Sequence, residues 1–181
     1  MYQWGAQSSV IRDLFTYGRE QAAKIGDENV FDFSIGNPTV PAPECIKDAV
    51  TEIMETRTAV AVHGYTAAAG DPVVRKGLAD YMNKTFNAGV EAGNFYMTCG
   101  AAASLTITLK ALVESPDDEI VVIAPYFPEY TAFIKNSGAE KVVVPPDMES
   151  FQIPFDALEQ AITSKTRALI INSPNNPSGV V

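Results

Sequence analysis

The sequence predicts an α/β protein built on a mainly parallel sheet with helices on both faces, in three layers. Short apolar segments at 119–124, 141–144 and 168–172 are separated by segments with helical periodicity. Strands without polar alternation are buried on both faces, which is typical of parallel sheets. Hydrophobic residues make up 46% of the 181 residues, which is enough for a packed core.

The first half of the chain is predicted to hold an N-terminal arm and three helices. Ser8 or Ser9 can cap a helix that runs to about Ile25, and Gly26 ends it. Residues 44–55 place apolar side chains on one face and predict a second helix. Asp71 and Pro72 supply a cap and a first-turn proline for a third helix, which runs to about residue 86.

Two further strands and three further helices are expected. Residues 31–35 alternate Phe, Asp, Phe, Ser and Ile, which predicts a strand. Residues 95–98 predict another strand, which leads through Gly100 into a helix over 101–113. The remaining helices are expected to end near Ser137 and to span about 154–163, each leading into the next strand.

Composition and charge exclude several classes of function. The formal net charge is -9, so no basic surface is available for nucleic acid or an anionic membrane. No apolar run is long enough to span a membrane and no secretion signal opens the chain, so we expect a cytoplasmic protein. One histidine and two cysteines argue against a metal site, a Ser-His triad and a disulfide scaffold.

Three loops follow predicted strands directly, at the sheet edge where open α/β folds bind ligands. Gly100 opens a helix whose free N–H groups can hold a phosphate. Phe127 offers a flat apolar ring, and Asn176 offers a neutral amide in a loop stiffened by two prolines. A phosphate, a planar ring and a ring hydroxyl occur together in pyridoxal 5'-phosphate.

With these motifs in order, the chain resembles the N-terminal part of a class I/II, fold-type I, pyridoxal-phosphate-dependent aminotransferase. The run Ser-Pro-Asn-Asn-Pro-Ser-Gly at 173–179 is similar to the family's Asn-Pro-x-Asn-Pro-Thr-Gly loop, with serine departing from asparagine and threonine. The resemblance implies that Asn176 hydrogen-bonds the pyridine hydroxyl oxygen. It also implies that the amides of Ala101 and Ala102, after Gly100, hold the cofactor phosphate.

The same resemblance assigns three more residues. Residues 125–130 resemble the segment that lays an aromatic ring on the cofactor, with Phe127 as the stacking residue. Tyr65 and Gly70 match an element whose tyrosine reaches the cofactor phosphate of the neighbouring subunit, which implies a homodimer. Gly36 matches the glycine whose backbone meets the substrate carboxylate.

By resemblance, residues 1–42 contribute to a small domain, and 43–181 form a partial large cofactor-binding domain truncated at its C-terminal end. The implied reaction transfers an amino group between an amino acid and a 2-oxo acid. In the family, the Schiff-base lysine lies downstream of the Asn-Pro loop. We therefore expect no catalytic residue in this chain and no activity from it alone. Lys110 lies roughly 15 Å down its helix from the phosphate turn, and the other lysines, Lys141 among them, are expected at solvated positions.

Each assignment has a structural alternative. Phe127 can be core, Tyr65 a surface tyrosine, and both Gly36 and Gly100 simple turns. Residues 117–119 are expected to form a solvated acidic loop. A carbon–sulfur lyase on the same fold and a non-catalytic module that keeps a cofactor pocket remain alternative functions.

Overall fold

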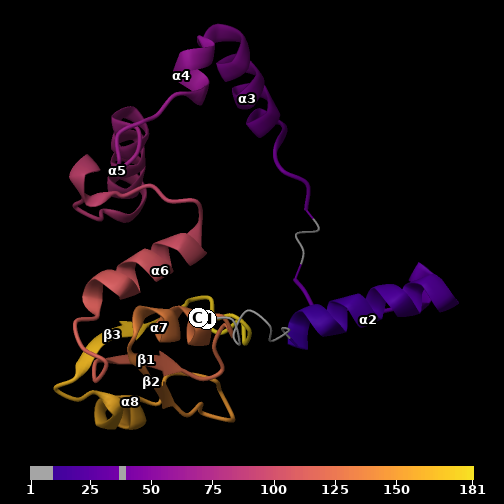
Figure 1. Cartoon of the computed structure of the whole chain (residues 1–181), viewed down its shortest axis with the longest axis vertical. Coiled ribbons are helices and arrows are strands. Elements are labelled where there is room, and N and C mark those ends of the chain that lie inside the picture. Colours follow the sequence, from indigo (N-terminus) through magenta and orange to yellow (C-terminus); the bar gives the residue numbers. More distant parts are fainter. Residues whose placement is uncertain (1–9, 37–39) are drawn as a thin grey trace. The chain divides into compact units, whose positions relative to one another are not determined.

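The computed structural model describes residues 10–36 and 40–181, and the chain divides into two compact units (Figure 1). Unit 1 is Met1–Gly64 and unit 2 is Tyr65–Val181. The expected division of the whole enzyme after residue 42 stays a prediction. No helix in the described ranges is both long and apolar enough to cross a membrane.

Unit 1 contains short and medium helices. They are α2 Val10–Ile25, the 3-10 helix η1 Asp27–Asn29, α3 Glu44–Thr56 and α4 Ala59–His63. Helix α2 therefore ends where predicted, and its expected serine cap lies outside the described residues. Helix α3 confirms the predicted helix over 44–55. Thr58 is the N-cap of α4, because its Oγ1 accepts a hydrogen bond from the Ala61 N–H (3.3 Å).

The predicted strand over residues 31–35 is wrong. Phe31 and Phe33 are 81% and 93% exposed, and no strand of the described chain pairs with this segment. The backbone N–H of Ser34 donates instead to Asp32 Oδ1 (2.8 Å). A local bond from an aspartate side chain to the backbone two residues on bends the chain and competes with a sheet ladder.

Unit 2 begins with α5 Pro72–Phe86, which has the predicted bounds. Asp71 Oδ1 accepts from the N–H groups of Val73 (2.7 Å) and Val74 (3.3 Å), so the expected cap is confirmed. The 3-10 helix η2 Ala92–Asn94 and helix α6 Ala101–Leu112 follow. The strand predicted at 95–98 is wrong, because a single bond from Met97 N–H to the Ala69 carbonyl (3.0 Å) does not make a ladder.

A three-stranded parallel sheet forms the centre of unit 2. Its strands are β1 Glu119–Ile123, β2 Glu140–Val144 and β3 Thr166–Ile170, in the order β2-β1-β3. Helices α7 Tyr130–Ser137 and α8 Phe155–Ala161 connect them. All three strands fall within one or two residues of their predicted positions, and the predicted parallel pairing is confirmed.

Alternate residues of β1 pack against different helices. Ile120 and Val122 lie in one cluster with Leu109 of α6 and Ile134 of α7. Val121 faces the other way, in a second cluster with residues of β2 and α8, Val144 and Leu158. The sheet is therefore covered on both faces, as predicted, with α6 and α7 on one side and α8 on the other (Figure 1).

The acidic segment at 117–119 differs from the expected solvated loop. Asp118 is only 5% exposed, at the amino end of β1. Its Oδ1 accepts a hydrogen bond from Arg167 Nε (2.9 Å), and its Oδ2 accepts from the N–H groups of Glu114 (2.7 Å) and Ser115 (2.9 Å). The acidic sequence at 117–119 did not predict the burial of Asp118, because the arginine that pairs with it comes from β3.

Candidate cofactor-binding site

The loops that follow β1 and β3 are joined by one side chain. Asn175 Nδ2 donates to the Pro125 carbonyl (3.0 Å) and to Ser178 Oγ (2.8 Å). Backbone bonds from Gly179 N–H to the Asn175 carbonyl (2.7 Å) and from Asn175 N–H to the Val180 carbonyl (2.8 Å) close the second loop on itself. The two carboxyl ends of the strands therefore form one structural element, as their position in a parallel sheet predicts.

The two neighbouring asparagines differ in what they contact. Asn175 is half-buried and uses its amide to hold the two loops together. Asn176 is exposed, and its side chain makes no hydrogen bond to any residue that the structure describes. Its amide can therefore bind a ligand without breaking a contact within the protein. The division of labour between these asparagines was not evident from the sequence.

Phe127 has features of both roles considered for it, a core residue and a ring that stacks on the cofactor. The ring is partly buried and packs against the cluster that contains Leu109 and Ile134. Its edge meets Tyr130, with ring centroids 5.6 Å apart and planes at 80°. Partial burial of this kind anchors one part of an aromatic ring and leaves the rest available for a planar ligand.

The start of α6 has the geometry of an anion site. Gly100 has φ +106°, a conformation that side chains rarely adopt, and no side chain caps the helix. The turn is fixed by a bond from Ser104 N–H to the Gly100 carbonyl (3.1 Å) and by a 2.6 Å contact between the hydroxyls of Thr98 and Ser104. Within the described residues, the exposed Ala101 and Ala102 have unpaired N–H groups, which suits a phosphate.

Helix α6 is held beside the aromatic segment. Leu105 packs against the same buried cluster as Phe127. Ala101 lies one helical turn before Leu105, about 6 Å along the axis. The structure thus brings Gly100, Ala101 and Ala102 to the side of the sheet that carries Phe127.

Tyr65 and Gly36 are the two predicted residues whose roles the structure does not test. Tyr65 is fully exposed, and Gly70 after it has φ +97°. A Cβ at Gly70 would overlap the side chain of Met97, so only glycine fits there. Gly36 is exposed in unit 1, and residues 37–39 lie outside the described ranges. The roles of Tyr65 and Gly36 stay predictions.

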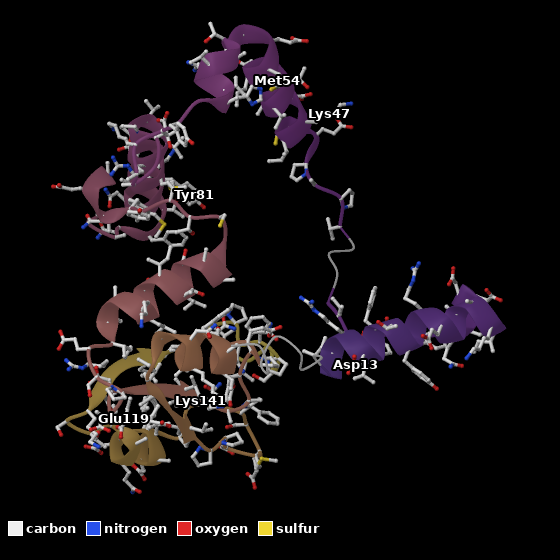
Figure 2. The ribbon with its side chains drawn as sticks, in the orientation of Figure 1. Asp13, Lys47, Met54, Tyr81, Glu119 and Lys141 are labelled. Atoms are coloured by element: carbon white, nitrogen blue, oxygen red, sulfur yellow. The ribbon has the colours of Figure 1, made fainter. Side chains whose placement is uncertain are left out.

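Lys141 is partly buried, contrary to the solvated position expected for it. Its Nζ donates to the hydroxyls of Tyr126 (2.6 Å) and Thr131 (2.8 Å) and lies 5.0 Å from the centre of the Tyr126 ring. Figure 2 labels Lys141 in unit 2. The strand register could have revealed this position, because Lys141 pairs with Ile120, whose side chain packs with α7.

These contacts change the acidity of Tyr126. Burial raises the pKa of the phenol. The hydrogen bonds with Lys141 and Thr131, together with the lysine charge, outweigh burial and bring the pKa below its usual value. A phenol oxygen that accepts a hydrogen bond from an ammonium group is held firmly in place. Because Tyr126 immediately precedes Phe127, this contact also restrains the segment that contains Phe127.

Lys110 of α6 also donates a hydrogen bond within the protein. Lys110 Nζ donates to the carbonyl of Ser137 (3.1 Å), at the end of α7. This contact fixes the C-terminal part of α6 to α7, and it directs the ammonium away from the start of α6, where Gly100 lies.

A pocket of ≈ 90 Å³ lies at the carboxyl ends of β1 and β3. Its wall is mostly apolar and includes Ile123, Tyr126, Tyr130, Ile170, Asn172 and Asn175. The described residues contain no group of three or more His, Cys, Asp or Glu side chains that could hold a metal ion. The polar and aromatic groups described above are amides, hydroxyls, aromatic rings and the N–H groups at the start of α6.

Comparison with known proteins identifies similar sequences and structures. The family model described as aminotransferase class I and II matches residues 28–181, and the aminotransferases of this family depend on pyridoxal phosphate. An aspartate aminotransferase from Pyrococcus horikoshii is 32% identical over 172 residues, which cover 94% of this chain and 41% of that protein. An asparagine–oxo-acid transaminase from Streptococcus mutans is 29% identical, with 93% and 42% covered.

A solved structure confirms the likeness of fold. An amino transferase from Eubacterium rectale shares 53% identity and a TM-score of 0.97, over 100% of this chain and 46% of its own. The chain thus spans less than half the length of the proteins it matches.

Proposed function

Because the chain belongs to the class I and II aminotransferase family, we propose that it is the N-terminal part of an enzyme that transfers an amino group between an amino acid and a 2-oxo acid. The observation that carries this proposal is the bond from Asn175 to Pro125, which joins the loops after β1 and β3. The neighbouring Asn176 amide is exposed and has no hydrogen-bond partner among the described residues. The expected cofactor is pyridoxal 5'-phosphate, which supplies an electron sink for the reacting carbon when bound.

The residues of unit 2 fit three parts of this cofactor. The N–H groups of Ala101 and Ala102, after Gly100, would hold the phosphate at the positive end of α6. Phe127 would lie against the ring, and the Asn176 amide would hydrogen-bond the ring hydroxyl oxygen. The unpaired N–H groups, the partly exposed aromatic ring and the free amide support this assignment.

Two further residues would act at a cofactor site that another subunit or another domain helps to form. Tyr65 would reach the cofactor phosphate of the neighbouring subunit in a homodimer, and its full exposure supports that role. Gly36 would present its backbone to the substrate carboxylate from the small domain. We also propose that the small-domain and large-domain parts of the whole enzyme divide after residue 42, and that the enzyme is cytoplasmic.

The lysine that binds the cofactor covalently is proposed to lie outside this chain. The ammonium groups of Lys110 and Lys141 are both occupied, by a carbonyl and by two hydroxyls. A lysine must release such contacts before its amine can react. We therefore expect the 181-residue chain alone not to transaminate.

The central test compares the two asparagines in the full-length protein. Asn176→Ala should weaken pyridoxal-phosphate binding about 10- to 100-fold, the loss of one hydrogen bond to a charged oxygen, and should lower the rate. The Tm of the cofactor-free protein should not change, because the Asn176 side chain forms no hydrogen bond with the residues that the structure describes. Asn175→Ala is the matched control and should lower that Tm. An unchanged cofactor spectrum and rate in Asn176→Ala would refute the assignment.

A second test addresses the chain by itself. The 181-residue chain is mixed with pyridoxal phosphate, treated with borohydride and analysed by peptide mass. We expect no lysine to be labelled selectively. Selective labelling of one lysine would show that the chain carries its own covalent site. If the full-length protein binds pyridoxal phosphate but transfers no amino group, the non-catalytic alternative is correct.

A further inference from the structure

Lys141 connects both sides of the segment that presents Phe127. Tyr126 immediately precedes Phe127, and Thr131 lies in the first turn of α7 after it. The Lys141 ammonium donates to both hydroxyls, at 2.6 and 2.8 Å. One side chain from β2 therefore closes residues 126–131 into a fixed bend, with Phe127 inside it.

The aromatic rings of this segment are coupled to the same contact. The Tyr126 ring stacks on Tyr130, with centroids 6.4 Å apart and planes at 13°. Tyr130 is nearly buried and meets the edge of Phe127 at 5.6 Å. A shift of Tyr126 would therefore be passed through Tyr130 to Phe127, because closely packed aromatic rings have little room to move independently.

The segment is held at its other end by a different residue. Asn175 Nδ2 donates to the Pro125 carbonyl (3.0 Å), one residue before Tyr126. Lys141 forms no ion pair with a carboxylate in the described ranges, so its hydrogen-bond partners here are the two hydroxyls. Maintaining a partly buried ammonium for two neutral hydroxyls is costly, which indicates that these contacts have a specific role.

We propose that Lys141 is a positioning residue, which sets the orientation of Phe127 against the cofactor ring through Tyr126 and Thr131. This inference rests on the proposed function. It assigns no chemical step to Lys141, because its ammonium contacts hydroxyls of the protein and acts on the cofactor only through the aromatic segment.

The test uses the full-length protein and three measurements on each variant: the Kd for pyridoxal phosphate, the circular dichroism of the bound-cofactor absorption band, and the Tm of the cofactor-free protein. Lys141→Met should raise the Kd about fivefold to tenfold and change the circular dichroism, which reports how the cofactor ring is held. Lys141→Arg should restore most of the signal, since arginine can donate to both hydroxyls. Lys165→Met, at an exposed lysine beyond the opposite end of the sheet, is the control.

Tyr126→Phe provides a second route if Lys141→Met does not fold. Tyr126→Phe keeps the ring and removes the acceptor, so it should reproduce the change in circular dichroism. The double variant should show little additional change, because both substitutions remove the same contact.

Three outcomes would contradict the inference. One is an unchanged Kd and circular dichroism in Lys141→Met and Tyr126→Phe, with Phe127→Ala still weakening cofactor binding. The second is a lower Tm with an unchanged cofactor band, which would show a role in folding alone. The third is failure of Lys141→Arg to restore a signal that Lys141→Met loses. Failure of the proposed function is distinguishable, because the wild-type protein would then bind no pyridoxal phosphate.

Discussion

The two ends of the parallel sheet use polar groups in opposite ways. At the amino ends of β1 and β3, a buried carboxylate accepts three hydrogen bonds from two segments of the chain. At the carboxyl ends, an amide and helix N–H groups have no partner among the described residues. The first end satisfies its polar groups within the protein, whereas the second leaves polar groups available to a ligand.

The amino-end contacts link β1 and β3. Asp118 accepts hydrogen bonds from Arg167 of β3 and from the N–H groups that follow α6, and Arg167 Nη2 also donates to Glu114 Oε2 (3.3 Å). Beside them, Thr163 Oγ1 donates to Glu119 Oε2 (2.6 Å), and Glu119 N–H donates to the Lys165 carbonyl (2.9 Å). We interpret this end as the structural end of the sheet.

The largest effect predicted from this comparison is on stability. Asp118→Ala should lower the Tm of the full-length protein by roughly 5 °C, because it leaves the Arg167 Nε–H and two backbone N–H groups without their acceptor. The rate per folded molecule should not change. Asp117→Ala is the matched control, since that neighbouring side chain is exposed. Thermal unfolding and steady-state kinetics measure both quantities, and equal Tm values for the two variants would contradict the structural assignment.

A smaller and different effect is expected at the start of α6. Gly100→Ala meets open space, but it forces a side chain into φ +106°, which costs about 1–2 kcal/mol. The Tm should therefore decrease by a few degrees, and the Kd for pyridoxal phosphate should increase because the N–H groups that we propose to bind the phosphate are displaced. Gly138→Ala, at the end of α7 with φ +98° and open space around it, is the control. It should lower the Tm similarly and leave the Kd unchanged. Equal Kd values for the two variants would contradict the phosphate site.

Local sequence signals predicted the elements whose causes are local. Asp71 and Pro72 fixed the start of α5, and the apolar segment at 119–124 predicted β1. The two strands predicted at 31–35 and 95–98 failed because a strand also needs a pairing partner, which a local pattern does not supply.

The site was predictable only in part for the same reason. The loops after the strands could be placed together because strands in a parallel sheet share an orientation. The roles of Asn175, Lys141 and Asp118 depend on partners far along the chain, namely Pro125, Tyr126 and Arg167. The motif at 173–179 indicated that an amide matters, and only the contacts show which asparagine is already engaged.

The smallest predicted effect is a dependence of stability on pH, which we expect from the amino end of the sheet and not from the carboxyl end. The N–H of Glu114, the Arg167 guanidinium and the N–H of Ser115 hold the pKa of Asp118 below its usual value, although burial opposes them. The charged carboxylate therefore stabilises the fold fully above the unfolded-state pKa of about 3.9, and this contribution is lost as the pH falls through the lower, folded-state pKa.

Asp118→Asn keeps the shape of the side chain and removes its charge, so it isolates this contribution. The difference in Tm between wild type and Asp118→Asn should be constant from about pH 5 to pH 7 and should shrink below about pH 4. Asn176→Ala should match wild type at every pH, because the Asn176 amide does not titrate and forms no hydrogen bond within the described part of the chain. A wild-type advantage over Asp118→Asn that persists undiminished well below pH 3 would mean that neutral hydrogen bonds, and not the carboxylate charge, hold the amino end of the sheet.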